Sequence, residues 1–197
     1  MKSIILHDFE VRNALKNDVI QIRRPVKNIP ECVILDMKRE SKLRDPNLTK
    51  WLLKMCKCHF GQPRDWLWVK ETWLKADDGY HYKSDASVIS EGIRKAYGYK
   101  WHSSVHMSGW ASRITLEVED VRVEPVQNIT EDDAKAEGFE DGCGPLGDGK
   151  FDDVLEREWT ARDEFCDVWD SLYAKKGFGW DDNLPVWVGR FKVVERK

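Results

Sequence analysis

The apolar positions of the chain follow an alternating period in some stretches and a helical period in others. The clearest alternation covers residues 114–126, where its phase changes at Asp120. Alternation is typical of a strand with one buried face, and a change of phase indicates a bulge or bend. Further strands are predicted where β-branched and aromatic residues cluster, at 19–24, 66–69 and 186–194, and a short apolar run at 3–6 opens the chain.

Helices are predicted at 9–16, 131–137 and 158–175. Asp8 precedes the first helix and is its predicted cap, while Thr130 caps the second and Gly138 ends it. The third carries aromatic residues at helical spacing. The predicted helices are therefore interspersed with the predicted strands along the chain.

The resulting order predicts an α+β fold. The first and last strands could pair, which favours a small closed or partly closed sheet with helices on its rim. Less regular stretches near 28–62, 76–100 and 138–157 are predicted insertions into a single domain covering residues 1–197. The middle stretch is predicted as a long loop or a hairpin, and it contains Tyr80, Tyr82, Tyr97 and Tyr99.

Composition narrows the class of protein. Charged residues make up 34% of the chain, and no apolar run approaches the length of a membrane span. The N-terminal apolar stretch is too short for a signal peptide. Five cysteines without a disulfide-scaffold spacing fit a reducing cytosol. We therefore expect a cytoplasmic protein.

Charge is unevenly distributed. Residues 16–75 carry 14 basic and 7 acidic side chains, whereas residues 117–170 carry 5 basic and 19 acidic ones. The basic part could bind the phosphate groups of a ligand. The acidic part argues against tight non-specific binding to a duplex, although it could equally be a solvated helical face.

Seven of the ten tryptophans lie in three short segments, 63–73, 100–113 and 177–187. Tryptophan is large and carries one N–H that needs a partner. Some of these rings are expected in the core. The others are interleaved with Arg, His and Lys, which favours a wall for a flat ligand such as a nucleobase.

Several polar residues are candidates for that ligand site. Arg23 and Arg24 point to opposite faces of their strand, so one could reach a phosphate. Glu71 could accept from a base amino group or act as a general base, or instead pair with Lys70 or Arg113.

A second group of candidates precedes the strand at 114–126. Trp110 could stack on a base, Arg113 could pair with phosphate, and His106 could donate or accept a proton. The alternative is that these three residues have a structural role and form a corner that leads into the strand at 114–126.

No metal or cofactor is expected. Cys56, Cys58 and His59 form a C-x-C-H sequence, but it lacks the second ligand pair of a closed zinc site, although Cys32 or His81 could be brought close. The sequence contains neither a phosphate-loop motif nor a G-x-S-x-G motif.

Five stretches together resemble the phage-type ASCH-domain proteins, which share a PUA-like β-barrel. They lie, in the family's order, at 4–12, 21–27, 61–73, 106–118 and 170–181. The resemblance implies a barrel whose cleft binds RNA or a modified nucleoside. Some small relatives hydrolyse N4-acylated cytidine with a Lys, a Thr and a Glu.

This sequence departs from the resembled catalytic pattern. Val19 stands at the Lys position and Ile22 at the Thr position, while Glu137 and Arg24 retain theirs. Losing a positioned acid–base group typically costs about 10²- to 10⁴-fold in rate. Amidohydrolase activity is therefore expected to be absent, unless Lys16 or Asp18 substitutes.

The leading hypothesis is a phage or prophage accessory protein of the bacterial host cytoplasm that binds RNA or a modified nucleobase in an aromatic cleft. Its predicted ligand-binding residues are Arg24, Glu71, Trp73, His106, Trp110 and Arg113. One alternative is a ribonuclease or deacylase with Glu71, Glu137 and His106 as acid–base groups. The other is a protein-binding inhibitor of a host factor.

Overall fold

The computed structural model describes residues 1–29, 51, 54–56, 58–142 and 159–197. The predicted insertions at 28–62 and 138–157 lie largely outside these residues, as does Cys32. Within the described part, helices and strands alternate along the chain, so the predicted α+β class is confirmed.

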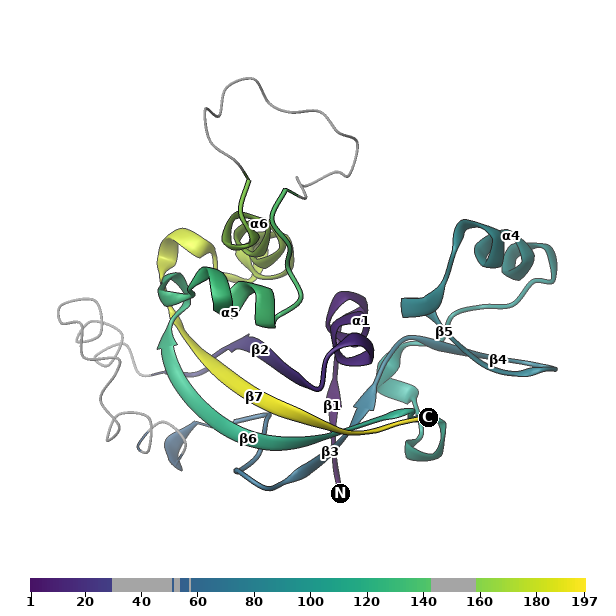
Figure 1. Cartoon of the computed structure of the whole chain (residues 1–197), viewed down its shortest axis with the longest axis horizontal. Coiled ribbons are helices and arrows are strands. Elements are labelled where there is room, and N and C mark those ends of the chain that lie inside the picture. Colours follow the sequence, from purple (N-terminus) through teal and green to yellow (C-terminus); the bar gives the residue numbers. More distant parts are fainter. Residues whose placement is uncertain (30–50, 52–53, 57, 143–158) are drawn as a thin grey trace. The chain divides into compact units, whose positions relative to one another are not determined.

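Five strands form one mixed sheet (Figure 1). In chain order they are β1 (Lys2–Ile5), β2 (Val19–Pro25), β3 (Trp66–Lys70), β6 (Ile114–Pro125) and β7 (Pro185–Arg196). Their order in the sheet is β1-β3-β6-β7-β2, with β1 parallel to β3 and β3 antiparallel to β6. Each predicted strand is present, and in β6 the exposed pair Glu119 and Asp120 marks the predicted change of phase.

The expected pairing of the first and last strands is wrong. β1 pairs with β3, and β7 lies between β6 and β2. Parallel strands need a crossover connection, and helix α1 (Asp8–Lys16) lies within the long stretch that joins β1 to β3. The described strands therefore form a sheet that has β1 and β2 at its ends.

The predicted helices are present with shifted starts. Helix α1 begins at Asp8, so its cap is His7, whose backbone N–H donates to Glu10 Oε2 at 2.8 Å. Helix α5 (Glu131–Ala136) is capped by Thr130 as predicted, and Gly138 follows it at φ +99°. Helix α6 (Ala161–Tyr173) starts later than predicted because Thr160 is its cap.

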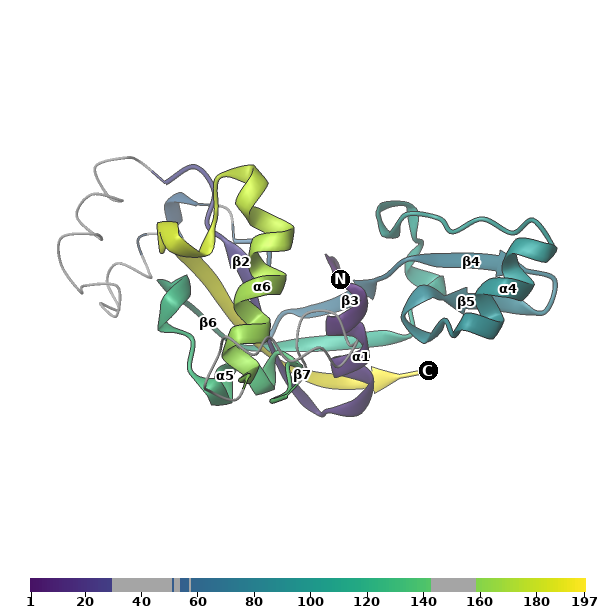
Figure 2. The same cartoon turned by 90° about the horizontal axis from the view of Figure 1, so that it is seen from above.

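Residues 76–100 are more ordered than the sequence predicts. Strands β4 (Trp73–Ala76) and β5 (Gly79–Tyr82) form the expected hairpin. The one-turn 3₁₀ helix η2 (Lys83–Asp85) and helix α4 (Val88–Ala96) follow, and α4 lies along one face of the hairpin (Figures 1 and 2). Gly92, a poor helix former, lies in the middle of α4 and obscures its pattern.

The described chain divides into two compact units, each with its own core. The first unit comprises residues 1–20, 60–120 and 190–197, and the second comprises 21–59 and 121–189. In the first, Phe60 packs edge-on against Phe191 with ring centroids 5.2 Å apart. In the second, α5 and α6 lie side by side and Trp187 is fully buried (Figure 2).

The tryptophans divide between core and surface. Trp169 and Trp187 are buried, whereas Trp51, Trp66 and Trp110 are exposed. The others have intermediate exposure. No helix among the described residues has the length and apolar composition needed to cross a membrane.

Candidate functional site

A cavity of about 480 Å³ lies in the first unit, between the β4–β5 hairpin, α4 and the segment that follows α4. Aromatic side chains dominate its wall, with three carboxylates and one guanidinium among the polar groups. The lining residues include Tyr80, Tyr82, Tyr97, Tyr99, Trp101, Asp77, Asp78, Asp85, His81 and Arg94. We call this cavity the aromatic pocket.

The hairpin positions one wall of the aromatic pocket. Asp77 and Asp78 form its two-residue turn, and Gly79 has φ +138°, a conformation that suits glycine. Trp73 exchanges two backbone hydrogen bonds with His102, at 2.7 and 3.2 Å. The strand β4 is thereby tied to the chain that returns past the pocket.

A polar network fixes the opposite wall. Arg94 donates to Glu91 at 2.9 Å and to the carbonyl oxygen of Tyr99 at 2.7 Å. Trp101 Nε1 donates to the other oxygen of Glu91 at 2.7 Å. These bonds lower the pKa of Glu91, with that from Trp101 the largest cause, so the carboxylate stays charged. These hydrogen bonds therefore fix helix α4 against the aromatic segment 97–101.

Arg113 supports the pocket through Asp85. Its guanidinium donates to both oxygens of buried Glu71 at 2.9 and 3.0 Å, and to Asp85 at 2.5 and 3.0 Å. It also lies 4.1 Å from the ring centroid of Tyr82. A further hydrogen bond of 2.9 Å runs from the guanidinium to Ser84 Oγ. We call these residues the Arg113 cluster.

The electrostatics of the Arg113 cluster follow from this pairing. Burial would lower the pKa of Arg113, but the hydrogen bonds to Glu71 and Asp85 outweigh it and raise that pKa. Burial, followed by the charge of Glu71, raises the pKa of Tyr82. Arg113 therefore stays positively charged within a network of hydrogen bonds and ion pairs.

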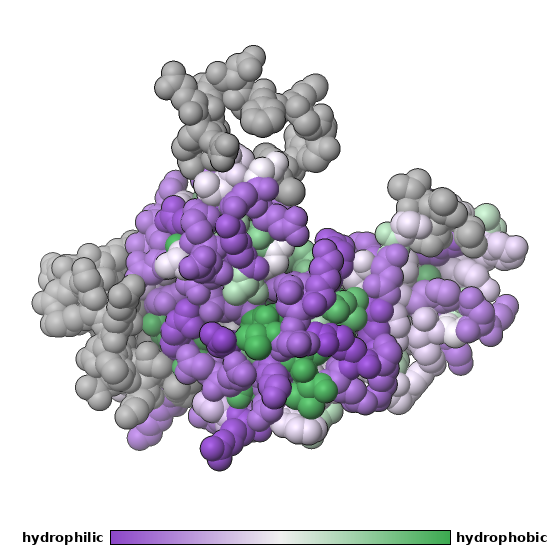
Figure 3. Space-filling view, viewed as in Figure 1, coloured by the Kyte–Doolittle hydropathy of each residue, from purple (hydrophilic) through white to green (hydrophobic). Residues whose placement is uncertain are grey.

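Aromatic rings continue from the pocket onto the surface. Tyr80 meets Trp110 edge-on with centroids 4.9 Å apart, and Trp73 lies 5.7 Å from Tyr80 and 5.1 Å from His102. Trp110 is 67% exposed, which leaves most of its ring available for stacking. In Figure 3 the part that carries β4 and β5 is largely pale, because Tyr and Trp lie near the middle of the hydropathy scale.

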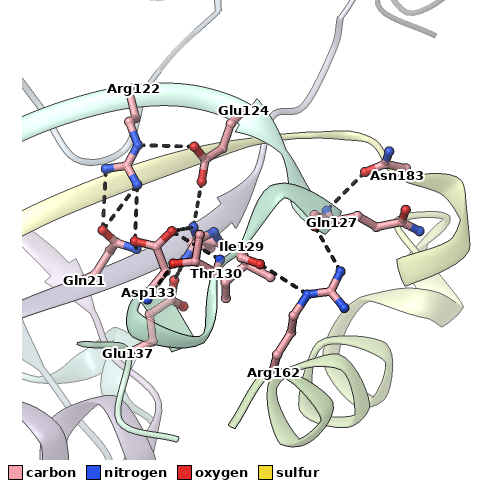
Figure 4. A network of polar contacts seen from close by, with 11 residues as sticks. Gln21, Arg122, Glu124, Gln127, Ile129, Thr130, Asp133, Glu137, Arg162 and Asn183 are labelled. Atoms are coloured by element: carbon pink, nitrogen blue, oxygen red, sulfur yellow. Dashed lines mark hydrogen bonds and ion pairs between the residues drawn. The ribbon is translucent and has the colours of Figure 1, made fainter. Parts of the chain in front are cut away.

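The second unit contains a separate buried ion network, the Arg23 cluster (Figure 4). Arg23 from β2 donates to Glu137 after α5, to Glu124 of β6 at 2.6 Å and to Asp133 of α5 at 3.1 Å. Its guanidinium is fully buried. Figure 4 also shows Gln21 between Arg122 and Asp133, whose Oδ1 accepts from Gln21 at 2.9 Å.

Burial and pairing oppose each other in the Arg23 cluster. Burial would lower the pKa of Arg23, but the charges of Glu137, Glu124 and Asp133 raise it. Burial would raise the pKa of Asp133, but the hydrogen bond from Gln21 and the charge of Arg23 lower it. Both groups are therefore charged at neutral pH.

The structure brings some predicted site residues together and not others. Glu71 and Arg113 form an ion pair, which was the open alternative for Glu71. Trp73 and Trp110 both contact Tyr80 at the edge of the pocket. His106 is exposed in the 3₁₀ helix η3 (Ser104–His106) and does not line the pocket.

The two arginines of β2 have different surroundings. The sequence favours Arg24 as a ligand-binding residue, and the structure places Arg23 in the buried cluster with Glu137. Arg24 is half-buried and donates to the carbonyl oxygen of Arg23 at 2.8 Å. The reason is the face of the strand: Gln21 and Arg23 share the face that meets the carboxylates of α5.

Sequence reasoning missed the lining residues of the pocket. The sequence indicates only a loop or hairpin for Tyr80, Tyr82, Tyr97 and Tyr99, and its motifs do not single out Arg94 or Trp101 as site residues. A signal was present, since four tyrosines within twenty residues exceed what a solvated loop needs.

The described residues contain no group of three or more His, Cys, Asp or Glu side chains arranged to hold a metal ion. Comparisons of the chain with protein-family models, with curated proteins and with solved structures found no match in any of the three.

Proposed function

We propose that the chain binds a nucleobase of single-stranded RNA, or a free nucleoside, in the aromatic pocket. One observation carries the proposal: five aromatic side chains converge on a single cavity of about 480 Å³ that also presents fixed carboxylates. A volume of this order suits a small ligand. Stacking on aromatic rings contributes about 1–3 kcal/mol per base.

The polar groups of the pocket match the edge of a base better than a phosphate. Carboxylates accept hydrogen bonds from the amino groups of bases. Asp77, Asp78 and Asp85 would repel a phosphate, and the one lining guanidinium, Arg94, already pairs with Glu91. The base would therefore enter the pocket while the sugar–phosphate backbone stays outside.

The surroundings of the pocket support binding of a strand. Exposed Trp110 contacts Tyr80 and offers a platform for a neighbouring base. Lys75, Lys95 and Lys100 flank the lining residues along the chain and are exposed, so they could contact phosphates.

The ASCH resemblance supports the same class of ligand. We include in the proposal that the mixed sheet is a PUA-like barrel scaffold of the ASCH type and that the protein serves a bacteriophage or prophage in its host's cytoplasm. The proposal leaves out amidohydrolase chemistry, because Glu71 accepts hydrogen bonds from Arg113 and Glu137 accepts one from buried Arg23.

The first test is a change at Tyr97, which lines the pocket but is 74% exposed and therefore dispensable for folding. Tyr97→Ala should weaken binding of a labelled single-stranded RNA of mixed sequence by roughly five- to 150-fold, since one stacking partner is lost. Fluorescence anisotropy measures the dissociation constant.

Trp66→Ala is the matched control, because Trp66 is 50% exposed and lies outside the pocket. It should leave the dissociation constant unchanged. Equal effects of the two changes, or no binding of RNA or nucleosides by the wild type, would overturn the proposed function.

A further inference from the structure

The aromatic pocket carries an excess of negative charge. Three of its lining side chains are carboxylates, and one is a guanidinium. Arg94 is neutralised by Glu91, and Asp85 shares Arg113 with Glu71. The remaining carboxylates, Asp77 and Asp78, belong to the hairpin turn at the cavity.

Each of these two carboxylates has a polar partner among the residues that line the pocket. Tyr99 Oη donates to Asp77 at 3.3 Å, and His81 Nε2 lies 2.8 Å from Asp78. The contact with His81 is the largest cause of a lowered pKa at Asp78, so that carboxylate is ionised at neutral pH. None of the described residues that line the cavity is a lysine. The carboxylates that line the cavity therefore outnumber its guanidinium, and a bound cation would be attracted to them.

The rings of the pocket already hold cations. The guanidinium of Arg113 lies 4.1 Å from the centroid of Tyr82, and that of Arg94 lies 5.8 Å from the centroid of Trp101. The faces of aromatic rings attract cations, most strongly where water is excluded. Tyr80, Tyr97 and Tyr99 line the same cavity and could receive a third cation in the same way.

We infer that the aromatic pocket selects a positively charged, N-alkylated base over the neutral parent base. This inference rests on the proposed function and names its ligand class. A neutral base gains stacking and hydrogen bonds alone. A base with a fixed positive charge keeps its flat shape and adds attraction to the ring faces and to Asp77 and Asp78.

The experiment compares nucleosides, which carry no phosphate. Isothermal titration calorimetry in mildly acidic buffer, where both modified bases are cationic, compares 7-methylguanosine with guanosine and 1-methyladenosine with adenosine. Each modified nucleoside should bind about tenfold more tightly than its parent.

A double variant, Asp77→Asn with Asp78→Asn, separates charge from shape. Asn and Asp both suit turn positions, so the hairpin should be retained. The variant should lose most of the preference for the charged base while its affinity for the parent nucleoside changes little. An unchanged preference would overturn the assignment of the two carboxylates.

The outcomes distinguish the inference from the proposed function. Equal affinity for charged and parent nucleosides would overturn the inference and leave the proposed function standing. If no nucleoside or RNA binds, both fail. If a trimethyl-lysine peptide binds more tightly than any nucleoside, the pocket recognises a modified protein and the inference is overturned.

Discussion

Arg113 and Arg23 each pair with several carboxylates, but their surroundings differ. Arg113 donates to Glu71 and Asp85 and stacks on Tyr82, so it combines ion pairing with support for the pocket wall. Arg23 is fully buried with Glu124, Asp133 and Glu137. In both cases removal of one partner would leave a charge in a low-dielectric site, which is the costly change.

Arg113→Ala should therefore destabilise the protein strongly. It leaves the carboxylate of Glu71, only 1% exposed, without its main partner, and such a loss costs about 3–5 kcal/mol. Urea denaturation gives the free energy of unfolding. Arg190→Ala is the control, because the Arg190–Glu119 pair is exposed and worth about 0–1 kcal/mol. Equal costs for the two changes would contradict the structural role of Arg113.

Asp133 should make stability depend on acid pH. Its pKa is lowered in the folded state, so its contribution is fully present above the unfolded value of about 4 and is lost as pH falls through the folded pKa. Asp133→Asn should thus lower the free energy of unfolding at neutral pH, and the difference from the wild type should shrink in acid.

Urea unfolding at neutral pH and at about pH 3 measures that difference. Asp132→Asn, at the exposed neighbouring position, should change stability little at either pH. A difference between Asp133→Asn and the wild type that stays constant with pH would show that the carboxylate contributes nothing through its charge.

Among the elements, the helices near the second unit's core depend on their caps. Thr160 accepts from the backbone of Asp163, and the Asp163 carboxylate accepts from the backbone of Thr160 at 3.1 Å. This reciprocal arrangement satisfies two N–H groups that a helix end otherwise leaves unpaired. It is also why α6 begins at Ala161.

Thr160→Ala should reduce the free energy of unfolding by about 1 kcal/mol, the usual value of such a cap. Thermal unfolding followed by circular dichroism detects a change of that size. Ser171→Ala on the same helix is the control, since Ser171 is exposed and donates within the helix, to the carbonyl oxygen of Val168. A larger loss for the control would mean that the cap does not define α6.

At the scale of the whole molecule, the pocket and the Arg23 cluster belong to different compact units. Every residue that lines the pocket lies between 74 and 101, in the first unit. Glu137 and its partner Arg23 lie in the second unit. Groups that share no partner usually act independently. The proposed ligand pocket therefore lies in a different unit from Glu137, the position that the ASCH resemblance connects with hydrolysis.

Glu137→Gln should consequently leave the affinity for nucleosides within about twofold of the wild type. Neither protein should release product from N4-acetylcytidine, as followed by liquid chromatography. Circular dichroism at the assay temperature checks that the variant is folded. Turnover by the wild type that disappears in Glu137→Gln would instead favour the hydrolase alternative.

Local signals in the sequence predict most of the helices and strands, but they do not predict the aromatic pocket. Alternation over 114–126, the cap at Thr130 and Gly138 after α5 are local features, and the structure confirms them. The shifted starts of α1 and α6 and the missed helix α4 show where local signals compete, with two plausible caps or a central glycine.

The sequence by itself determined the α+β class and the positions of its strands, because periodicity and capping act between residues close in the chain. Only the tertiary structure decided that Arg23 rather than Arg24 is buried, that Glu71 pairs with Arg113 across 42 positions, and that five aromatic residues line one pocket. These outcomes depend on strand faces and on contacts between segments far apart, which no local pattern encodes.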